Sequence, residues 1–308
     1  MQTSIVASLS DTGGRSPVDA TTHNLAQLRD EGFRRVWLTQ LPWEPDLLTV
    51  LAVVLREVDR IEVATGVIPI QNQHPMLLAQ RALTLSLIGN GRFILGLGMT
   101  HQTVTEGMWG IPWDKPVRRL REYLNGLQPL LAGQAADALG ETVTTRGALQ
   151  IPGAPTPDVY IAALGPQLLR LAGRRTAGTF TWMTGPKTLA DHVGPTLRQG
   201  AADAGRPDGS VRVVAALPVS VTDDVAGVRA QAARQFAMYG HLPSYRATLD
   251  REGFAGPADA AIIGDERVVA DRIEELRAAG VDEFVGGVFD SSTEGRARTR
   301  ALLRQMDS

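Results

Sequence analysis

The sequence predicts an α/β protein of the (β/α)8 TIM-barrel class, with insertion loops at the carboxyl-terminal face of the barrel. Short apolar, β-branched runs alternate with longer segments of helical periodicity, which is typical of βα units around a parallel sheet. Eight such runs occur, each followed by a helical segment. A closed (β/α)8 barrel consists of eight such strand–helix units. The runs span residues 4–8, 35–39, 61–68, 93–98, 159–163, 178–183, 211–221 and 283–289.

Two helical segments have clear ends. The first spans residues 116–131, with Asp114 as its expected cap and Gly133 as its stop. The second spans residues 266–279 and ends at Gly280. In both, apolar side chains recur every three or four residues, which predicts one buried face. They are Leu120, Leu124, Leu127 and Leu131 in the first helix, and Val269, Ile273 and Leu276 in the second.

The chain length is compatible with one domain. Its 308 residues lie within the size range of a single barrel domain. No segment with the composition of a linker interrupts the βα order, so we expect one domain over residues 1–308. Three connections are too long for plain barrel turns, at residues 99–115, 133–158 and 241–263. Long loops on a barrel commonly carry function, so these segments are expected near the site.

Composition excludes several functional classes. The hydrophobic fraction of 44% and charged fraction of 21% are those of a folded globular chain. Lys and Arg total 31 against 33 Asp and Glu, with no basic tract, which argues against a nucleic-acid partner. No cysteine is present, which excludes disulfides and thiolate chemistry. The first residues do not resemble a secretory signal and no apolar stretch is long enough to span a membrane, so a cytoplasmic protein is expected.

The expected carboxyl ends of the strands, where barrel active sites lie, carry neutral, small or aromatic residues. The five histidines show no paired spacing, so no metal site is predicted. Neither two facing carboxylates for glycoside hydrolysis nor a lysine for Schiff-base chemistry stands there. A bound cofactor is therefore the natural carrier of the reaction.

Two strand ends are candidate phosphate sites. Gly98, Met99 and Thr100 leave one strand through small residues that allow close approach of backbone amides. The segment Ala163, Leu164, Gly165 and Pro166 leads from a strand into a helix whose first amides and dipole suit an anion. The alternatives are that glycines 96 and 98 relieve crowding in the barrel wall, and that residues 163–166 form an ordinary corner.

Aromatic residues at the strand ends and beyond are candidates for an apolar substrate pocket. They are Trp43, Trp109, Trp113 and Trp182, the last followed by Met183. Each tryptophan could instead anchor its own loop, and Trp182 is the strongest candidate because it ends a strand. His101 is a candidate proton donor or phosphate ligand, whereas His74, at a helix start, is expected to bond locally. The arginines 118, 119 and 121 are expected on a solvated helix face.

Several segments together resemble the luciferase-like monooxygenase superfamily, and within it the F420-dependent actinobacterial branch. The glycine-rich run at residues 91–98 resembles the fourth-strand motif of the superfamily. Further matching segments follow at residues 106–110, 114–116, 121–123, 162–166, 181–186 and 242–246. The similarity runs in order from about residue 32 to residue 289, so it is more specific than any single motif.

The resemblance implies a (β/α)8 barrel, usually dimeric, that holds the deazaflavin ring at its carboxyl-terminal mouth. It implies a non-prolyl cis peptide in the third strand, at Gly66 and Val67 here. By the same resemblance Thr39 and Gln40 should line the ring, the segment 98–100 the tail, and the segment 163–166 the phosphate. A small organic molecule is the expected substrate.

One departure from the family pattern indicates the direction of the reaction. Sugar-phosphate dehydrogenases of the family carry an Asp-His pair where this sequence has Thr39 and Gln40. Because no proton acceptor stands there, reduction of an activated C=C, C=N or C=O bond is favoured, with F420 as cofactor and His101 as a candidate donor beside Gln40. The alternatives are an FMN-dependent monooxygenase and a non-catalytic ligand-binding barrel.

Overall fold

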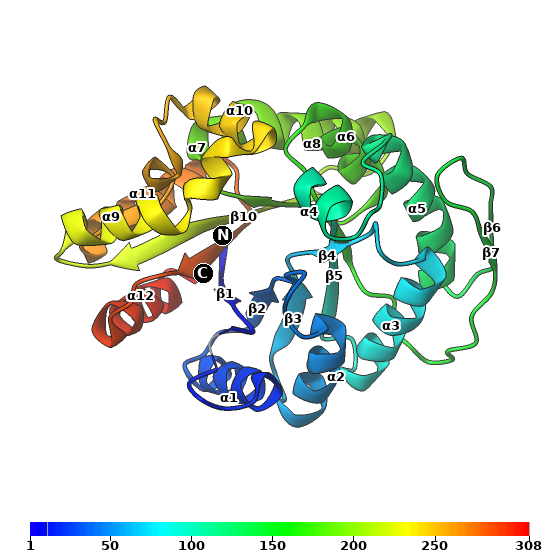
Figure 1. Ribbon diagram of the computed structural model, residues 1–308, viewed down its shortest axis with the longest axis horizontal. Coiled ribbons are helices and arrows are strands. Elements are labelled where there is room, and N and C mark those ends of the chain that lie inside the picture. The colour runs from blue at the N-terminus through cyan, green and yellow to red at the C-terminus, as the bar shows by residue number, and fades with distance from the viewer. Residues whose placement is uncertain (11, 308) are drawn as a thin grey trace. The chain divides into compact units, whose positions relative to one another are not determined.

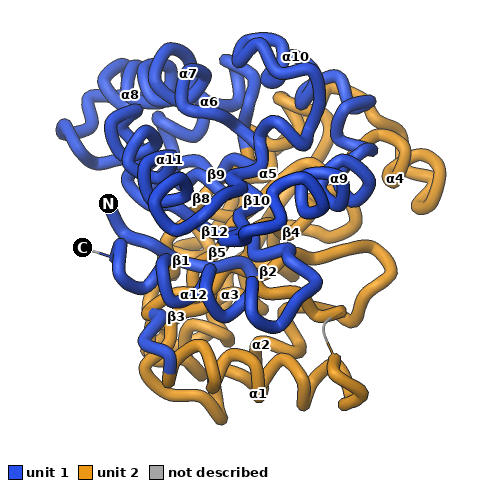
Figure 2. The backbone as a smooth tube through the Cα atoms, turned by 90° about the vertical axis from the view of Figure 1, so that its left-hand side faces the viewer, with its two compact units in different colours: residues 1–6, 31–33, 163–308 blue, residues 7–30, 34–162 orange. Residues whose placement is uncertain are grey.

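The computed structural model describes residues 1–10 and 12–307. The chain divides into two compact units, coloured separately in Figure 2. Unit 1 comprises Met1–Val6, Glu31–Phe33 and Ala163–Ser308, and unit 2 comprises Ala7–Asp30 and Arg34–Ala162. A single domain over the whole chain stays a prediction.

Unit 2 contains a parallel sheet in the order β2, β3, β5, β8, and β4 pairs with β5 beside β3. The strands of unit 2, including the separate antiparallel pair β6–β7, are β2 (Arg35–Leu38), β3 (Glu62–Thr65), β4 (Ile68–Pro69), β5 (Phe93–Gly98), β6 (Ala136–Ala138), β7 (Thr145–Gly147) and β8 (Val159–Ala162). Its helices are α1 (Pro17–Asp30), α2 (Leu47–Glu57), α3 (Pro75–Ile88), α4 (Gln102–Gly107) and α5 (Pro116–Leu131). Helices α1, α2, α3 and α5 pack side by side in that order (Figure 1).

Unit 1 contains the remaining parallel strands, with β10 paired to β9, β11 and β12, and β12 paired to β1. The strands are β1 (Gln2–Ala7), β9 (Gly178–Trp182), β10 (Arg212–Val221), β11 (Ile262–Gly264) and β12 (Glu283–Val288). The helices are α6 (Pro166–Arg175), α7 (Pro186–Thr188), η1 (Leu189–Val193), α8 (Gly194–Asp203), α9 (Val225–Gln235), η2 (Ala237–His241), α10 (Pro243–Glu252), η3 (Pro257–Asp259), α11 (Glu266–Ala278) and α12 (Thr293–Gln305).

The predicted alternation of parallel strands and helices is confirmed. All eight expected strands are present, and the largest shift at a strand start is in the first, which begins at Gln2 rather than Ser4. The predicted stripes of α5 and α11 are buried, because an amphipathic helix gains most by turning its apolar face to the sheet. Residues 61–68, expected as one strand, form β3 and β4 with Gly66 and Val67 between them.

Other expectations need correction. Asp114 does not cap α5: Lys115 takes the cap position with a φ of 44° and no side-chain cap, and Asp114 lies 3.6 Å from Arg119. The three long connections are not plain loops. They contain helix α4, the antiparallel pair β6–β7, and helix α10 with the start of β11. Capping and short pairings depend on contacts that helical periodicity does not encode.

The glycines of β5 make room for the segment that separates β3 from β4. A Cβ at Gly96 would lie 1.9 Å from the carbonyl oxygen of Thr65, and one at Gly98 would lie 2.4 Å from a methyl carbon of Val67. The Thr65 hydroxyl donates to the Gly96 carbonyl oxygen at 2.9 Å and accepts from the Gly96 amide at 2.8 Å. These contacts show that glycines 96 and 98 relieve crowding in the barrel wall. Contact of Gly98 with a cofactor stays a prediction.

We expect Gly98→Ala to destabilise the chain by about 1–3 kcal/mol, because the new methyl group would overlap a stiff β-branched side chain. Thermal or urea unfolding measures this. The double variant Gly98→Ala/Val67→Ala should be more stable than the sum of the single changes allows. Gly107→Ala is the matched control, since a Cβ there meets no described atom within 4 Å. Equal losses for Gly98→Ala and Gly107→Ala would contradict this packing account.

Candidate functional site

Three neighbouring strands of unit 2 meet at their carboxyl ends through backbone and small side-chain contacts. The Thr39 hydroxyl, just after β2, donates to the Gly66 carbonyl oxygen at 3.1 Å. The Gly66 amide donates to the carbonyl oxygen of Leu38 at 2.7 Å. The peptide between Gly66 and Val67 is cis, as the resemblance implies. Thr39, Gly66, Val67 and Gly98 are therefore brought together.

Gln40 organises its own loop. Its side-chain Nε2 donates to the Leu41 carbonyl oxygen at 2.8 Å, and its Oε1 accepts from the Leu47 amide at 2.7 Å. Leu47 begins α2, so Gln40 ties the end of β2 to the start of the next helix. Both polar groups of the amide already have partners in the loop, and a catalytic role for Gln40 stays a prediction.

Residues 99–101 carry the chain from β5 into α4. Met99 and Thr100 are partly exposed, and the Thr100 amide donates to the Gln71 side-chain oxygen at 3.4 Å. His101 occupies the cap position of α4 without a side-chain cap bond. Burial lowers the pKa of the His101 imidazole below its ordinary 6.5, because the charged ring would lose water. The ring is therefore mainly neutral at pH 7.

The tryptophans of unit 2 lie on loops beyond the strand ends. Trp43 is 68% exposed, so it walls no buried cavity within this unit. Trp109, after α4, is half-buried, and its amide donates to the Val104 carbonyl oxygen. The Trp113 amide donates to the Glu106 carboxylate at 3.0 Å, which anchors that loop. Substrate contact for Trp43 and Trp109 stays a prediction.

In unit 1 the segment 163–166 forms an open helix start. Ala163 is buried, and the Leu164 carbonyl oxygen accepts a hydrogen bond from the His192 ring at 2.9 Å. Gly165 is the exposed cap residue of α6, followed by Pro166, and it supplies no side-chain cap. A Cβ at Gly165 would meet no described atom within 4 Å. Uncapped amides, the helix dipole and free space suit an anionic group.

An aromatic cluster surrounds the end of β9 in unit 1. Trp182 makes edge contacts with Phe236 and Tyr239, with centroid distances of 6.1 and 6.2 Å. Phe289, after β12, contacts Phe236 at 5.4 Å. Gly287 leaves room for the indole, since a Cβ there would lie 2.9 Å from it. Trp182 is thus packed within an apolar wall of aromatic side chains, and its contact with a substrate stays a prediction.

Met183 and two tyrosines add chemistry to this wall. Met183 is buried, and its backbone has a φ of 55°. This conformation is rare for residues other than glycine and is often found at functional sites. Tyr239 and Tyr245 contact each other at 4.9 Å, and burial raises the pKa of each phenol, so both stay protonated at neutral pH. Tyr245 lies in one of the matching segments, whereas Tyr239 lies just before the predicted loop at residues 241–263, without a motif to mark it.

The described residues contain no group of three or more His, Cys, Asp or Glu side chains arranged to hold a metal ion. Within the same residues no helix is both long and apolar enough to cross a membrane. His74 bonds locally, as expected: its Nδ1 accepts from the Met76 amide, and its Nε2 bonds to the Thr144 carbonyl oxygen. Unit 2 therefore offers backbone amides and hydroxyls at its strand ends, and unit 1 offers an open helix start and aromatic faces.

Comparisons with known proteins place the chain in a family. A family model described as luciferase-like monooxygenase matches residues 6–283. The 5,10-methylenetetrahydromethanopterin reductase of Methanolobus tindarius is 30% identical over 250 residues, which cover 80% of this chain and 75% of that protein.

Two solved structures share the fold. The coenzyme F420-dependent tetrahydromethanopterin reductase of Methanopyrus kandleri superposes with a TM-score of 0.81 at 22% identity, over 99% of this chain and 97% of that one. An FMN complex of a type II Baeyer-Villiger monooxygenase from Pseudomonas putida superposes with a TM-score of 0.78 at 18% identity, over 100% and 97%. The predicted (β/α)8 barrel is confirmed, and because the family model covers most of its length, the chain belongs to the luciferase-like monooxygenase family of oxidoreductases.

Proposed function

We propose that the chain is an F420-dependent reductase, which transfers hydride to an activated C=C, C=N or C=O bond of a small organic substrate. The observation that carries the proposal is the chemistry of the strand ends. Thr39 and Gln40 hold no proton acceptor, and the Gln40 amide is engaged within its own loop. A bound cofactor then has to supply the redox step. The reductase from Methanolobus tindarius supports the same reaction class.

The residues present fit a deazaflavin. Thr39, Gly66 and Val67 would back the ring, and Gly98, Met99 and Thr100 would hold the start of the tail. The open, uncapped start of α6 at residues 163–166 would bind a phosphate through backbone amides. Gln40 would position this end of β2 by fixing the loop that follows it.

When bound in its reduced form, the deazaflavin supplies a hydride. The chain has to bind the substrate beside it, exclude water and provide a proton. The wall around Trp182 and Met183 in unit 1 would exclude water and pack against an apolar substrate. Substrate contact for Trp43 and Trp109 of unit 2 is part of the same proposal. His101 would donate the proton in its imidazolium form. Because burial lowers the pKa of the ring, this form is a stronger acid than an ordinary imidazolium.

The second candidate is an FMN-dependent monooxygenase, favoured by the FMN complex on the same fold. A catalytically silent barrel that only binds a ligand is the third. The proposal also includes a homodimer in the cytoplasm with no nucleic-acid or membrane partner.

Titration of the purified chain separates these candidates. We expect tight binding of F420 and weak binding of FMN, measured by fluorescence or calorimetry. Gly165→Asp should weaken F420 binding about 10-fold or more, because a carboxylate would stand where the phosphate binds. It should leave thermal stability unchanged or higher, since Asp is a good helix cap. Gly165→Asn is the neutral control with the same shape.

Three outcomes would contradict the proposal. Tight FMN binding without F420 binding would favour the monooxygenase. Binding of neither cofactor would favour the silent barrel. Equal F420 affinity in Gly165→Asp and Gly165→Asn would remove the start of α6 from the phosphate site.

The role of His101 predicts a pH profile. Because the imidazolium form donates, turnover should level off below the His101 pKa, which lies below 6.5, and should fall by about 10-fold per pH unit above it. His101→Gln should lose this dependence while F420 affinity is kept. His23→Gln, at an exposed position of α1, is the control. The same profile in His101→Gln and in the unchanged chain would show that solvent or another residue supplies the proton.

A further inference from the structure

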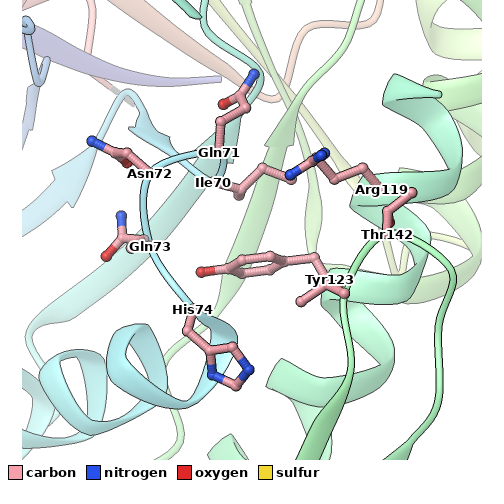
Figure 3. A pocket seen from close by; sticks show the side chains of 9 residues that line it. Ile70, Gln71, Asn72, Gln73, His74, Arg119, Tyr123 and Thr142 are labelled. Carbon is pink, nitrogen blue, oxygen red and sulfur yellow. The ribbon is translucent and has the colours of Figure 1, made fainter. Parts of the chain in front are cut away.

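A cavity of about 300 Å³ lies within unit 2, on the side of helix α5 (Figure 3). The loop at residues 70–74 forms one wall, and Arg119 and Tyr123 of α5 form the opposite one. Residues 142 and 143, from the connection between β6 and β7, complete the lining. The volume is at the lower end of the range for small-molecule sites, so a small metabolite fits.

Two buried hydrogen-bond donors in this lining lack partners among the described residues. The Tyr123 side chain is 1% exposed, and its hydroxyl, which points toward the loop at 70–74 in Figure 3, bonds to none of them. Gln71 is 8% exposed; its Oε1 accepts from the Thr100 amide, whereas its Nε2 has no such partner. Buried polar groups are usually paired, so two open donors in one cavity point to a missing acceptor.

The charges around the cavity favour an anion. The Arg119 guanidinium extends from α5 toward Ile70 and Gln71 in Figure 3, and it forms a long ion pair with the Asp114 carboxylate at 3.6 Å. Arg81 lies near enough to Tyr123 to influence its hydroxyl electrostatically. The lining contains no Asp or Glu. Arg119 therefore belongs to a binding wall, whereas Arg118, which pairs with Glu141, and the exposed Arg121 match the predicted solvated face.

Several other polar groups of the lining are already paired. The Thr142 hydroxyl and amide both donate to the carboxylate of Glu122, which lies outside the lining, at 2.6 and 2.7 Å. Both nitrogens of His74 bond locally, as described above. The Gln73 Nε2 donates to the Pro69 carbonyl oxygen at 2.9 Å. The buried donors left open are thus the Tyr123 hydroxyl and the Gln71 amide, and Arg119, paired with Asp114, is the one cation among the described lining residues.

We propose that this cavity is a binding site for a small molecule with one carboxylate, held by Tyr123 and Arg119. One neutral donor and one lining cation match a single negative charge, and the planar guanidinium matches a planar carboxylate. Ile70 and Val143 provide apolar surface for a short aliphatic body. The site does not depend on the proposed cofactor, although Gln71 also contacts Thr100.

Calorimetry of the full chain with butyrate as the probe tests the site, with butyramide as its neutral counterpart and inorganic phosphate as a second anion. Butyrate should bind more tightly than either. Tyr123→Phe and Arg119→Met should each weaken butyrate about 10-fold or more, as expected for hydrogen bonds to a charged group. Arg118→Met, outside the lining, should leave it unchanged.

Thermal unfolding and the cofactor complete the test. Tyr123→Phe should keep or raise the melting temperature, because it removes a hydroxyl without a partner; a large fall would overturn the assignment of that hydroxyl as open. Equal binding of butyrate and butyramide, tighter binding of phosphate, or no binding at all would overturn the carboxylate site. Displacement of butyrate by F420 would show that the cavity belongs to the cofactor site. Failure of F420 to bind, with butyrate binding intact, would affect only the proposed function.

Discussion

The candidate site depends on one close contact, in which the segment between β3 and β4 packs against the glycines of β5. Thr65 and Val67 approach the backbone of Gly96 and Gly98 so closely that no Cβ fits between them. Because Thr39 bonds to Gly66 in the same segment, the ends of three strands share one set of contacts. Close packing of this kind transmits a change at one strand end to the others. The position of Gly66 and Val67, which are proposed to back a cofactor ring, is thus a consequence of this packing.

Several polar side chains near the candidate sites already have hydrogen-bond partners within the fold. The Gln40 amide bonds within its own loop, and the His74 ring bonds at the start of α3 and to the Thr144 carbonyl oxygen. The Glu122 carboxylate accepts hydrogen bonds from residues 142 and 143. The groups that keep spare hydrogen-bonding capacity are of another kind: the open start of α6 and the side-chain donors of Tyr123 and Gln71. This division separates residues that hold the fold from residues that are available to a ligand.

The sequence was most informative where a local pattern meets a local cause. The ends of α5 and β5 were predicted from periodicity and from glycine and proline positions, and the cis peptide from the resemblance. The cap of α5 and the secondary structure inside the long connections were not. Tyr239 could not have been found, because its importance comes from contacts with Trp182 and Tyr245, which lie far from it or on another element.

By itself, the sequence determined the (β/α)8 class, the absence of charged residues at the strand ends and the family, because hydrophobic periodicity and motif order are properties of the chain. The tertiary structure decided why Gly96 and Gly98 are glycines, which polar groups remain open, and that Arg119 and Tyr123 of α5 face Gln71 across a cavity. The physical reason is that crowding and hydrogen-bond satisfaction are properties of pairs of residues. Those pairs exist only when distant segments pack together.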